Sequence, residues 1–341
     1  MRKVTLQDVA EEACVHASTV SRALDPEKAN LVNPDTRDRV RSVAQELGYR
    51  GDAVASGLRR GRTNTLGLVV ADISNPFIGP VVRGIENNLE GRDKMLFVAE
   101  SQDDHGRMSR VMDSLLGRRV DAVITTAARR GDERLLRQVA QQVPFVLAVR
   151  NLPDSGLVAI THDDERGGRL AAEHLVEQGH RRVAQLPGSD DISSFWGRAR
   201  GFREGLAGTG VELVEPSESG RHPVFAEGRR LLELLLTEQD ELPTAVFAHN
   251  DLMAFGALQA LSSHGLSCPA DIAVIGYNDT LMTEFTDPPI TTVRLPGYEL
   301  GRMAADTAVA LMEDGHRPEP PLSLPPVLVP RHSTLGWSSP E

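Results

Sequence analysis

From about residue 63 onward, short apolar runs alternate with longer amphipathic stretches, and this alternation constrains the fold more than any other feature. The apolar runs span residues 65–71, 95–99, 122–125, 145–149, 157–160, 183–186, 245–248 and 272–276. Stretches with helical periodicity, such as residues 168–178 and 228–237, lie between them. Strands that alternate with helices form parallel sheets, and this many strands predicts two such α/β lobes. Ligands of such sheets bind beyond the carboxyl ends of the strands.

The first 48 residues have a different pattern, which predicts three short helices. Apolar residues at helical spacing indicate a first helix over residues 6–13, with Thr5 and Asp8 as a capping pair. A third helix begins at Asn33–Pro34, an N-cap followed by proline at the first helical position. The second helix, over residues 17–24, carries outward-facing polar side chains: Ser18, Thr19, Ser21 and Arg22. Two helices joined by a short turn fit the major groove of DNA, whereas the spacing alone also permits a plain three-helix bundle.

Charge is distributed unevenly along the chain. The net charge of −11 argues against a nucleic-acid partner, but residues 1–62 hold 11 basic and nine acidic residues, so the head is mildly basic.

The two cysteines, Cys14 and Cys268, are too few for a disulfide framework and lack the spacing of a zinc site. No export signal and no apolar run of the ~18 residues that a membrane span needs are evident. We expect a cytoplasmic protein without a metal, a cofactor or a membrane partner.

The head sequence VTLQDVAEEACVHASTVSRAL, followed by VNPDTRDRVRSVAQELGYR, resembles the start of the LacI/GalR (lactose-repressor) family. Further family signatures are matched at Asp72–Phe77 (DISNPF), Gly179-His180, Gly201-Phe202, Asn250-Asp251, Gly276–Asp279 (GYND) and Thr291–Val293 (TTV). The resemblance implies an all-α helix-turn-helix head at residues 1–48, a hinge at 49–62 and an effector-binding, dimerising domain at 63–335. That domain would fold like the type I periplasmic sugar-binding proteins, with parallel sheets in two lobes. The N-lobe would take about 63–161 and 293–324, and the C-lobe about 162–292 and 325–335.

The same resemblance implies which residues contact DNA. In the head these are Thr5, His16, Ala17, Ser18, Thr19, Ser21 and Arg22, and in the hinge they are Ala55 and Leu58. Arg22 would donate two hydrogen bonds to guanine, and Leu58 would wedge between base steps in the minor groove. Cys14 stands where the family usually has glycine, so we expect a positive φ there that strains the turn. His16 replaces a usual N-cap, and either caps the second helix or reaches the DNA.

The implied effector site contains Asp72, Phe77, Thr125, Val149, Arg198, Phe225, Asn250, Asn278 and Leu295. Arg198 would bind a hydroxyl or carboxylate of the effector, or else be a surface residue. Sugar-binding relatives commonly have acids at the positions of Val149 and Asn278 and a polar residue at that of Leu295. Their absence weakens the assignment of a sugar as the effector. A less hydroxylated, anionic or partly apolar effector, or none, is the alternative.

Catalytic motifs are absent from the sequence, including a phosphate-binding GxGxxG, a P-loop, HExxH and a nucleophile elbow. We therefore expect a transcription repressor, with activation also possible, and no catalytic residues. A ligand-binding receptor without a DNA role and a cytoplasmic α/β enzyme are the alternatives.

The proline-rich segment after residue 315 lacks the heptads of a coiled coil, which favours a homodimer. Such a dimer would bind a pseudo-palindromic operator in double-stranded DNA.

Overall fold

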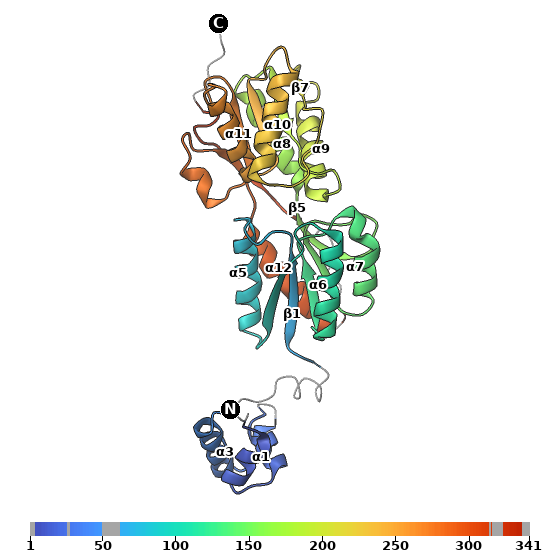
Figure 1. Ribbon diagram of the computed structural model, residues 1–341, viewed down its shortest axis with the longest axis vertical. Coiled ribbons are helices and arrows are strands. Elements are labelled where there is room, and N and C mark those ends of the chain that lie inside the picture. Colours follow the sequence, from blue (N-terminus) through green and yellow to red (C-terminus); the bar gives the residue numbers. More distant parts are fainter. Residues whose placement is uncertain (1–3, 26–27, 50–61, 314, 316–322, 336–341) are drawn as a thin grey trace. The chain divides into compact units, whose positions relative to one another are not determined.

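The computed structural model describes residues 4–25, 28–49, 62–313, 315 and 323–335. The chain divides into two compact units, residues 1–63 and 64–341, drawn in Figure 1. The predicted hinge contacts Ala55 and Leu58 lie outside the described residues.

The first unit contains the three predicted helices. Its elements are α1 (Leu6–Glu12), α2 (Ala17–Ala23), the 3-10 turn η1 (Ala29–Leu31) and α3 (Pro34–Glu46). Thr5 and Asp8 form the predicted capping box at the start of α1, and Asn33 caps α3. Val9, Val20 and Val40, one from each helix, are fully buried and form the centre of a small core. The outward side of α2 therefore remains available for contacts outside the head.

Cys14 adopts the strained backbone that the resemblance implies. It lies in the turn between α1 and α2 with φ of +51°, in the left-handed region that favours glycine. Its side chain is exposed, so the residue gains no packing that offsets this conformation.

Replacing Cys14 by glycine is expected to stabilise the head by about 1 kcal/mol, because the strain of a left-handed residue with a Cβ disappears. Thermal unfolding followed by circular dichroism on the full chain would show the head melting at a higher temperature. Cys14→Ala is the matched control, because it removes the thiol and retains the Cβ. An equal gain in both variants would contradict the backbone explanation.

His16 is the N-cap of α2. Its Nδ1 accepts a hydrogen bond from the backbone N–H of Ser18 at 3.2 Å and lies 2.8 Å from the Ser18 hydroxyl. The ring thus replaces the missing serine or threonine cap, and it remains exposed at the end of the helix.

The second unit contains two six-stranded sheets. The first sheet has the strand order β11-β5-β4-β3-β1-β2, and all of its strands are parallel. The second sheet has the strand order β12-β10-β9-β8-β6-β7, and in it only β12 runs antiparallel to its neighbour. The strands of the first are β1 (Thr65–Val70), β2 (Met95–Glu100), β3 (Ala122–Thr125), β4 (Phe145–Val149), β5 (Val158–His162) and β11 (Ser323–Leu324). Those of the second are β6 (Arg182–Leu186), β7 (Glu212–Val214), β8 (Ala245–Ala248), β9 (Ala273–Asn278), β10 (Thr291–Arg294) and β12 (Val327–Val329).

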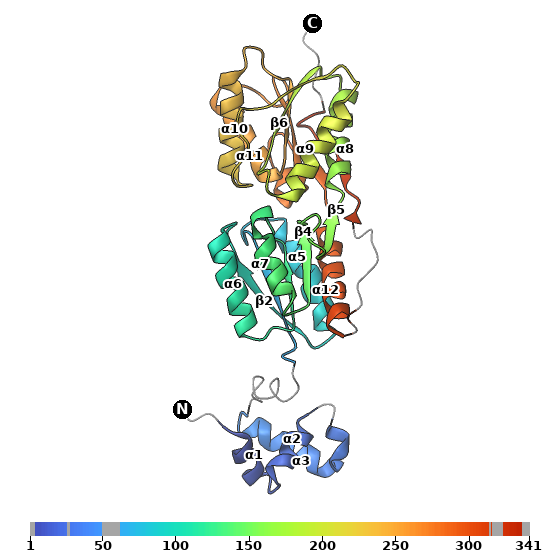
Figure 2. The ribbon, with the colours of Figure 1, turned by 90° about the vertical axis from the view of Figure 1, so that its right-hand side faces the viewer.

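Helices cover both faces of each sheet, as Figure 2 shows. In the N-lobe, α5 (Ile78–Glu90) and α12 (Gly297–Glu313) lie on one face, and α6 (His105–Gly117), η2 (Arg130–Asp132) and α7 (Glu133–Ala140) on the other. In the C-lobe, α8 (Asp164–Glu177) and α9 (Ser193–Leu206) lie on one face, and α10 (Phe225–Glu238) and α11 (Asp251–Ser263) on the other. The 3-10 turn η3 (Leu281–Glu284) follows β9.

Glycine pairs set the spacing of the helices within three pairs. A Cβ on Gly201 of α9 would overlap the carbonyl oxygen of Glu165, and one on Gly168 of α8 would overlap that of Arg198. The same reciprocal arrangement joins α5 to α12 and α10 to α11, through Gly84 with Gly301 and Gly228 with Gly256. The α8–α9 contact matters most for function, because it fixes the position of the face of α9 that carries Arg198.

The chain passes between the two lobes three times. It leaves the first sheet after β5, returns to the N-lobe between β10 and α12, and crosses again between β11 and β12. The chain returns to the N-lobe at residues 295–296 rather than at the expected boundary of about 293, because β10 continues in the second sheet through Arg294. One apolar cluster runs through this junction and includes Phe77, Val149 and Leu295.

Candidate functional site

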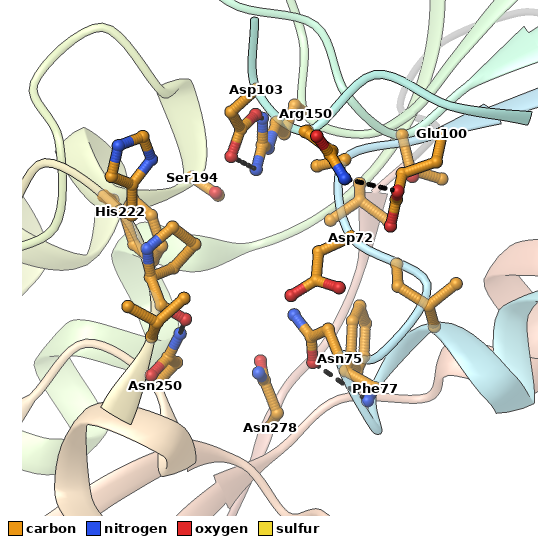
Figure 3. A pocket seen from close by; sticks show the side chains of 18 of the residues that line it. Asp72, Asn75, Phe77, Glu100, Asp103, Arg150, Ser194, His222, Asn250 and Asn278 are labelled. Atoms are coloured by element: carbon orange, nitrogen blue, oxygen red, sulfur yellow. Dashed lines mark hydrogen bonds and ion pairs between the residues drawn. The ribbon is translucent and has the colours of Figure 1, made fainter. Parts of the chain in front are cut away.

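A cavity of about 300 Å³ lies between the two lobes, at the carboxyl ends of their strands. The N-lobe wall follows β1, β2, β3 and β4, and the C-lobe wall comes from α9, the segment before α10, the start of α11 and the end of β9. In Figure 3, Asp72, Asn75 and Glu100 lie on one side and His222, Ser194 and Asn250 on the other. This is the position at which parallel α/β sheets bind ligands, and the volume is at the lower end for small-molecule sites.

Six of the nine residues predicted for the effector site line this cavity: Asp72, Phe77, Val149, Arg198, Asn250 and Asn278. The structure places the other three elsewhere. Thr125 donates its hydroxyl hydrogen to the Val69 carbonyl at the end of the sheet, and its neighbour Thr126 lines the cavity instead. Phe225 begins α10 and is 41% exposed, while Leu295 is buried in the apolar junction between the lobes.

The cavity also contains residues that sequence reasoning missed: Asn75, Glu100, Gln102, Asp103, Thr126, Arg150, Ser194, Phe195, His222 and Val224. Glu100, Thr126 and Arg150 lie at or directly after the carboxyl ends of β2, β3 and β4. The rule that places ligands at these ends would have identified them. His222 lies well beyond the end of β7 (Glu212–Val214), so the same rule does not place it, and the resemblance implied only Phe225 from this part of the chain.

Arg198 is buried, and its charge is paired within the protein. Its Nε donates to Oδ1 of Asp164 at 2.9 Å, and its Nη1 donates to the carbonyl oxygen of His249. The guanidinium lies 3.9 Å from the centre of the Tyr277 ring, a cation–π contact. Burial raises the pKa of Asp164 above its ordinary value, although the charge of Arg198 opposes this shift. The predicted alternative of a surface arginine is therefore wrong, since the Arg198 side chain is only 4% exposed.

A second charged pair forms part of the N-lobe wall. Arg150 donates two hydrogen bonds to Asp103, from Nη1 at 2.6 Å and from Nη2 at 3.4 Å, and both side chains are less than a tenth exposed. Burial acts to raise the pKa of Asp103, but Arg150 outweighs it, so the pKa lies below its ordinary value and the carboxylate stays ionised. Both cavity arginines thus have an internal carboxylate partner.

Neutral polar atoms complete the wall. Thr126 Oγ1 and Asn278 Oδ1 are buried and have no hydrogen-bond partner among the described residues. Asn250 is already engaged, because its amide donates to the carbonyl of Pro223 at 2.9 Å and its Oδ1 caps α11 at Met253. Asn250 therefore holds the segment that carries His222 against the cavity, while Thr126 and Asn278 retain hydrogen-bonding capacity.

On the head, the predicted DNA contacts divide into exposed and partly covered side chains. His16, Ser18 and Arg22 are exposed along α2, and Thr5 is exposed at the start of α1. Ala17, Thr19 and Ser21 are partly buried at the edges of the same surface. All seven predicted head residues thus lie either in α2 or at the N-caps of α1 and α2.

A helix-turn-helix head joined to a two-lobed domain with an interlobe cavity defines the class of ligand-controlled DNA-binding regulators. The family model for "Bacterial regulatory proteins, lacI family" matches residues 5–52, and that for a periplasmic binding protein-like domain matches residues 172–334. The regulator DegA of Bacillus subtilis is 31% identical over 335 residues, covering 97% of this chain and 98% of DegA. GalR of Escherichia coli is 32% identical, covering 96% of this chain and 95% of GalR. The chain belongs to the LacI family of bacterial transcriptional regulators.

Solved structures agree with this assignment. The lac repressor dimer bound to operator and the anti-inducer ONPF is 28% identical, with a TM-score of 0.87, covering 98% of this chain and all of that one. The CelR–cellobiose complex is 32% identical, with a TM-score of 0.72, covering 97% of this chain and all of that one. The protein is thus a DNA-binding transcriptional regulator controlled by an effector, and not an enzyme.

None of the described helices is both long and apolar enough to cross a membrane. Within the same part of the chain, no group of three or more histidine, cysteine, aspartate or glutamate side chains could hold a metal ion.

Proposed function

We propose that the protein binds a pseudo-palindromic operator as a homodimer in the cytoplasm, with α2 of each head in the major groove. Three exposed side chains support this geometry: His16 at the N-cap of α2, and Ser18 and Arg22 on the helix itself. Arg22 specifies a guanine through two parallel hydrogen bonds, and Thr19 and Ser21 contact phosphates. Hinge residues 55 and 58 complete the contacts in the minor groove.

Two exposed apolar patches support the homodimer. The first lies on the edge strand β2 and consists of Met95, Phe97 and Val98, which are 60%, 39% and 38% exposed. The second lies on and beside η3 and consists of Leu281, Met282 and Phe285, which are 72%, 54% and 73% exposed. Apolar groups gathered in this way mark interaction sites, and an uncovered edge strand is a further reason for a partner. Each lobe thus contributes one patch to an interface between two copies, as expected of a relative of a repressor solved as a dimer.

For the effector, we propose a small, uncharged, hydroxyl-bearing metabolite. The main support is that both arginines of the cavity are already paired with carboxylates of the protein. An anionic effector would have to compete with Asp164 for Arg198 and with Asp103 for Arg150. A hydroxylated molecule instead uses the free hydrogen-bonding capacity of Thr126 and Asn278. Asp72 also lines the cavity and supplies the kind of carboxylate that positions 149 and 278 lack. Cellobiose bound to CelR is a relative's example of this class of ligand.

A selection of binding sites from a random duplex library with the full-length protein tests the DNA-binding proposal. We expect enrichment of two inverted half-sites. Absence of any enriched sequence at moderate salt, with and without a panel of neutral sugars, would refute the proposal.

Replacing Arg22 by alanine is expected to weaken binding to the selected operator by about 10- to 100-fold, because a bidentate arginine–guanine contact contributes about 1–3 kcal/mol. Affinity for random duplex should fall much less. Fluorescence anisotropy at fixed salt measures both. Arg41→Ala, at an exposed position on α3, is the control, since it removes one positive charge from the head without changing α2. Equal losses on both DNAs would contradict base reading by Arg22.

A further inference from the structure

Arg129 joins the two lobes through contacts that lie outside the effector cavity. It follows β3 in the N-lobe, and its Nε and Nη2 donate to the two carboxylate oxygens of Asp191, at 2.8 and 2.9 Å. Asp191 belongs to the C-lobe, in the loop between β6 and α9. Nη2 also donates to the Ser189 hydroxyl at 3.2 Å, and that hydroxyl donates to Asp191 at 2.6 Å. We call Arg129, Ser189 and Asp191 the interlobe latch.

The backbone reinforces the same contact. The N–H of Arg130 donates to the carbonyl oxygen of Asp191 at 3.0 Å. Side-chain exposure is 17% for Arg129 and 39% for Asp191, so the pair is partly shielded from water and salt. Burial acts to raise the pKa of Asp191, but the hydrogen bond from Arg129 outweighs it, and the pKa lies below its ordinary value. A two-pronged, partly buried pair of this kind is stronger than an ordinary surface ion pair.

The latch also contacts the cavity wall through Arg129. Its Nη1 donates to the carbonyl oxygen of Asp103 at 3.2 Å, while the carboxylate of Asp103 pairs with Arg150 inside the cavity. Gln102 and Asp103 both have left-handed backbones, with φ of +56° and +51°. A turn in this conformation needs support from its surroundings, and Arg129 supplies it at the Asp103 backbone while Arg150 supplies it at the Asp103 carboxylate. Arg129 thus positions a cavity residue and holds the opposite lobe with one side chain.

We propose that the interlobe latch holds the two lobes closed independently of effector binding, and that Arg129 transmits the state of the cavity wall at Asp103 to the interface between the lobes. The effector and the latch then favour the same closed arrangement. Removing the latch lowers the apparent affinity of any effector that binds the closed cleft, since part of the binding free energy must close the lobes.

Hydrogen exchange of the full-length protein without effector tests the latch, using two backbone amides that bridge the lobes. One is Arg130 N–H; the other is Asn151 N–H, which donates to the Ser193 hydroxyl at 2.9 Å in a separate contact. In Arg129→Gln and in Asp191→Asn, we expect both amides to exchange roughly 3- to 10-fold faster, because lobe opening exposes both. The exchanged-charge variant Arg129→Asp/Asp191→Arg should recover part of the protection.

The control is Arg229→Gln, which breaks a pair with Glu233 that lies entirely within α10. It should leave both amides unchanged. Faster exchange at Arg130 alone would mean that only a local contact was lost, and it would overturn the proposal, as would unchanged exchange at both positions. Because no effector or DNA is used, such a failure is separate from a failure of the proposed effector class.

Discussion

Replacing Arg198 by methionine is expected to lower the free energy of unfolding by about 3–5 kcal/mol, because it leaves a buried carboxylate without its partner. Asp164 is only 9% exposed and depends on Arg198 for a hydrogen bond and for charge compensation. Methionine keeps the apolar stem against Tyr277 and Phe195, so the loss of packing is small. Urea unfolding followed by fluorescence and circular dichroism measures the effect.

The double variant Arg198→Met/Asp164→Leu separates stability from effector binding. Replacing both members of a buried pair by apolar residues is often neutral, so most of the lost stability should return. The response to the effector should stay reduced, because the double variant still lacks the Arg198 hydrogen bond to the His249 carbonyl, which holds the cavity wall next to Asn250. Native mass spectrometry of the purified protein would identify a retained molecule to use as the effector. A double variant as unstable as Arg198→Met would contradict this account of the pair.

Acidification from pH 6.5 to about 4.5 is expected to reduce the free energy of unfolding by several kcal/mol. His162, His174, His180 and His249 are all buried, and burial is the largest cause that lowers their pKa values. The pKa of His162 falls to about 3, with the charge of Arg198 as a further cause, and that of His180 falls to about 4. Below pH 6.5 the unfolded chain binds protons that the native protein does not, so stability decreases as the pH falls.

Two buried acids, Asp164 and Asp251, act in the opposite direction, because burial raises the pKa of each. Burial raises the pKa of Asp251 to about 6, so the native protein takes up a proton there before the unfolded chain does. These two gains offset part of the loss from the four histidines. The carboxylates Asp103 and Asp191, whose pKa values lie below their ordinary value, add to that loss, so stability still decreases with acid.

Urea unfolding measured at half-unit pH steps gives the number of protons taken up. In His162→Gln, unfolding near pH 5 should take up about one proton fewer than in the unmodified protein. His332→Gln, at an exposed position, is the control and should leave the slope unchanged. An unchanged slope in His162→Gln would show that this histidine is not the source of the pH dependence.

Local patterns in the sequence were sufficient to predict most of the fold. The strands β3, β4 and β8 have the bounds that their apolar runs predict, and the helices of the head begin at the predicted caps. Short strands gave no such signal. In particular, β11 and β12 have two and three residues in a proline-rich segment, and only pairing with distant strands defines them.

The candidate site was less predictable, because its chemistry depends on contacts between distant positions. The resemblance indicated Arg198, but its partner Asp164 is 34 residues away in the sequence, and nothing in either segment shows that the charge is already paired. The same holds for Arg150 and Asp103, which lie 47 residues apart. The alternative of an anionic effector rested on the missing acids at positions 149 and 278 and on Arg198 facing the cavity, and the two internal pairs support the proposal of a neutral effector instead.

The three crossings between the lobes restrict how this regulator can move. Each sheet takes a strand from beyond residue 322, so neither lobe corresponds to one continuous stretch of chain. Opening the cleft must therefore bend three connections at once, near residues 163, 295 and 325, which permits rotation about a common axis and opposes independent tumbling. A protease that cut one of these connections would leave the lobes tethered by the other two.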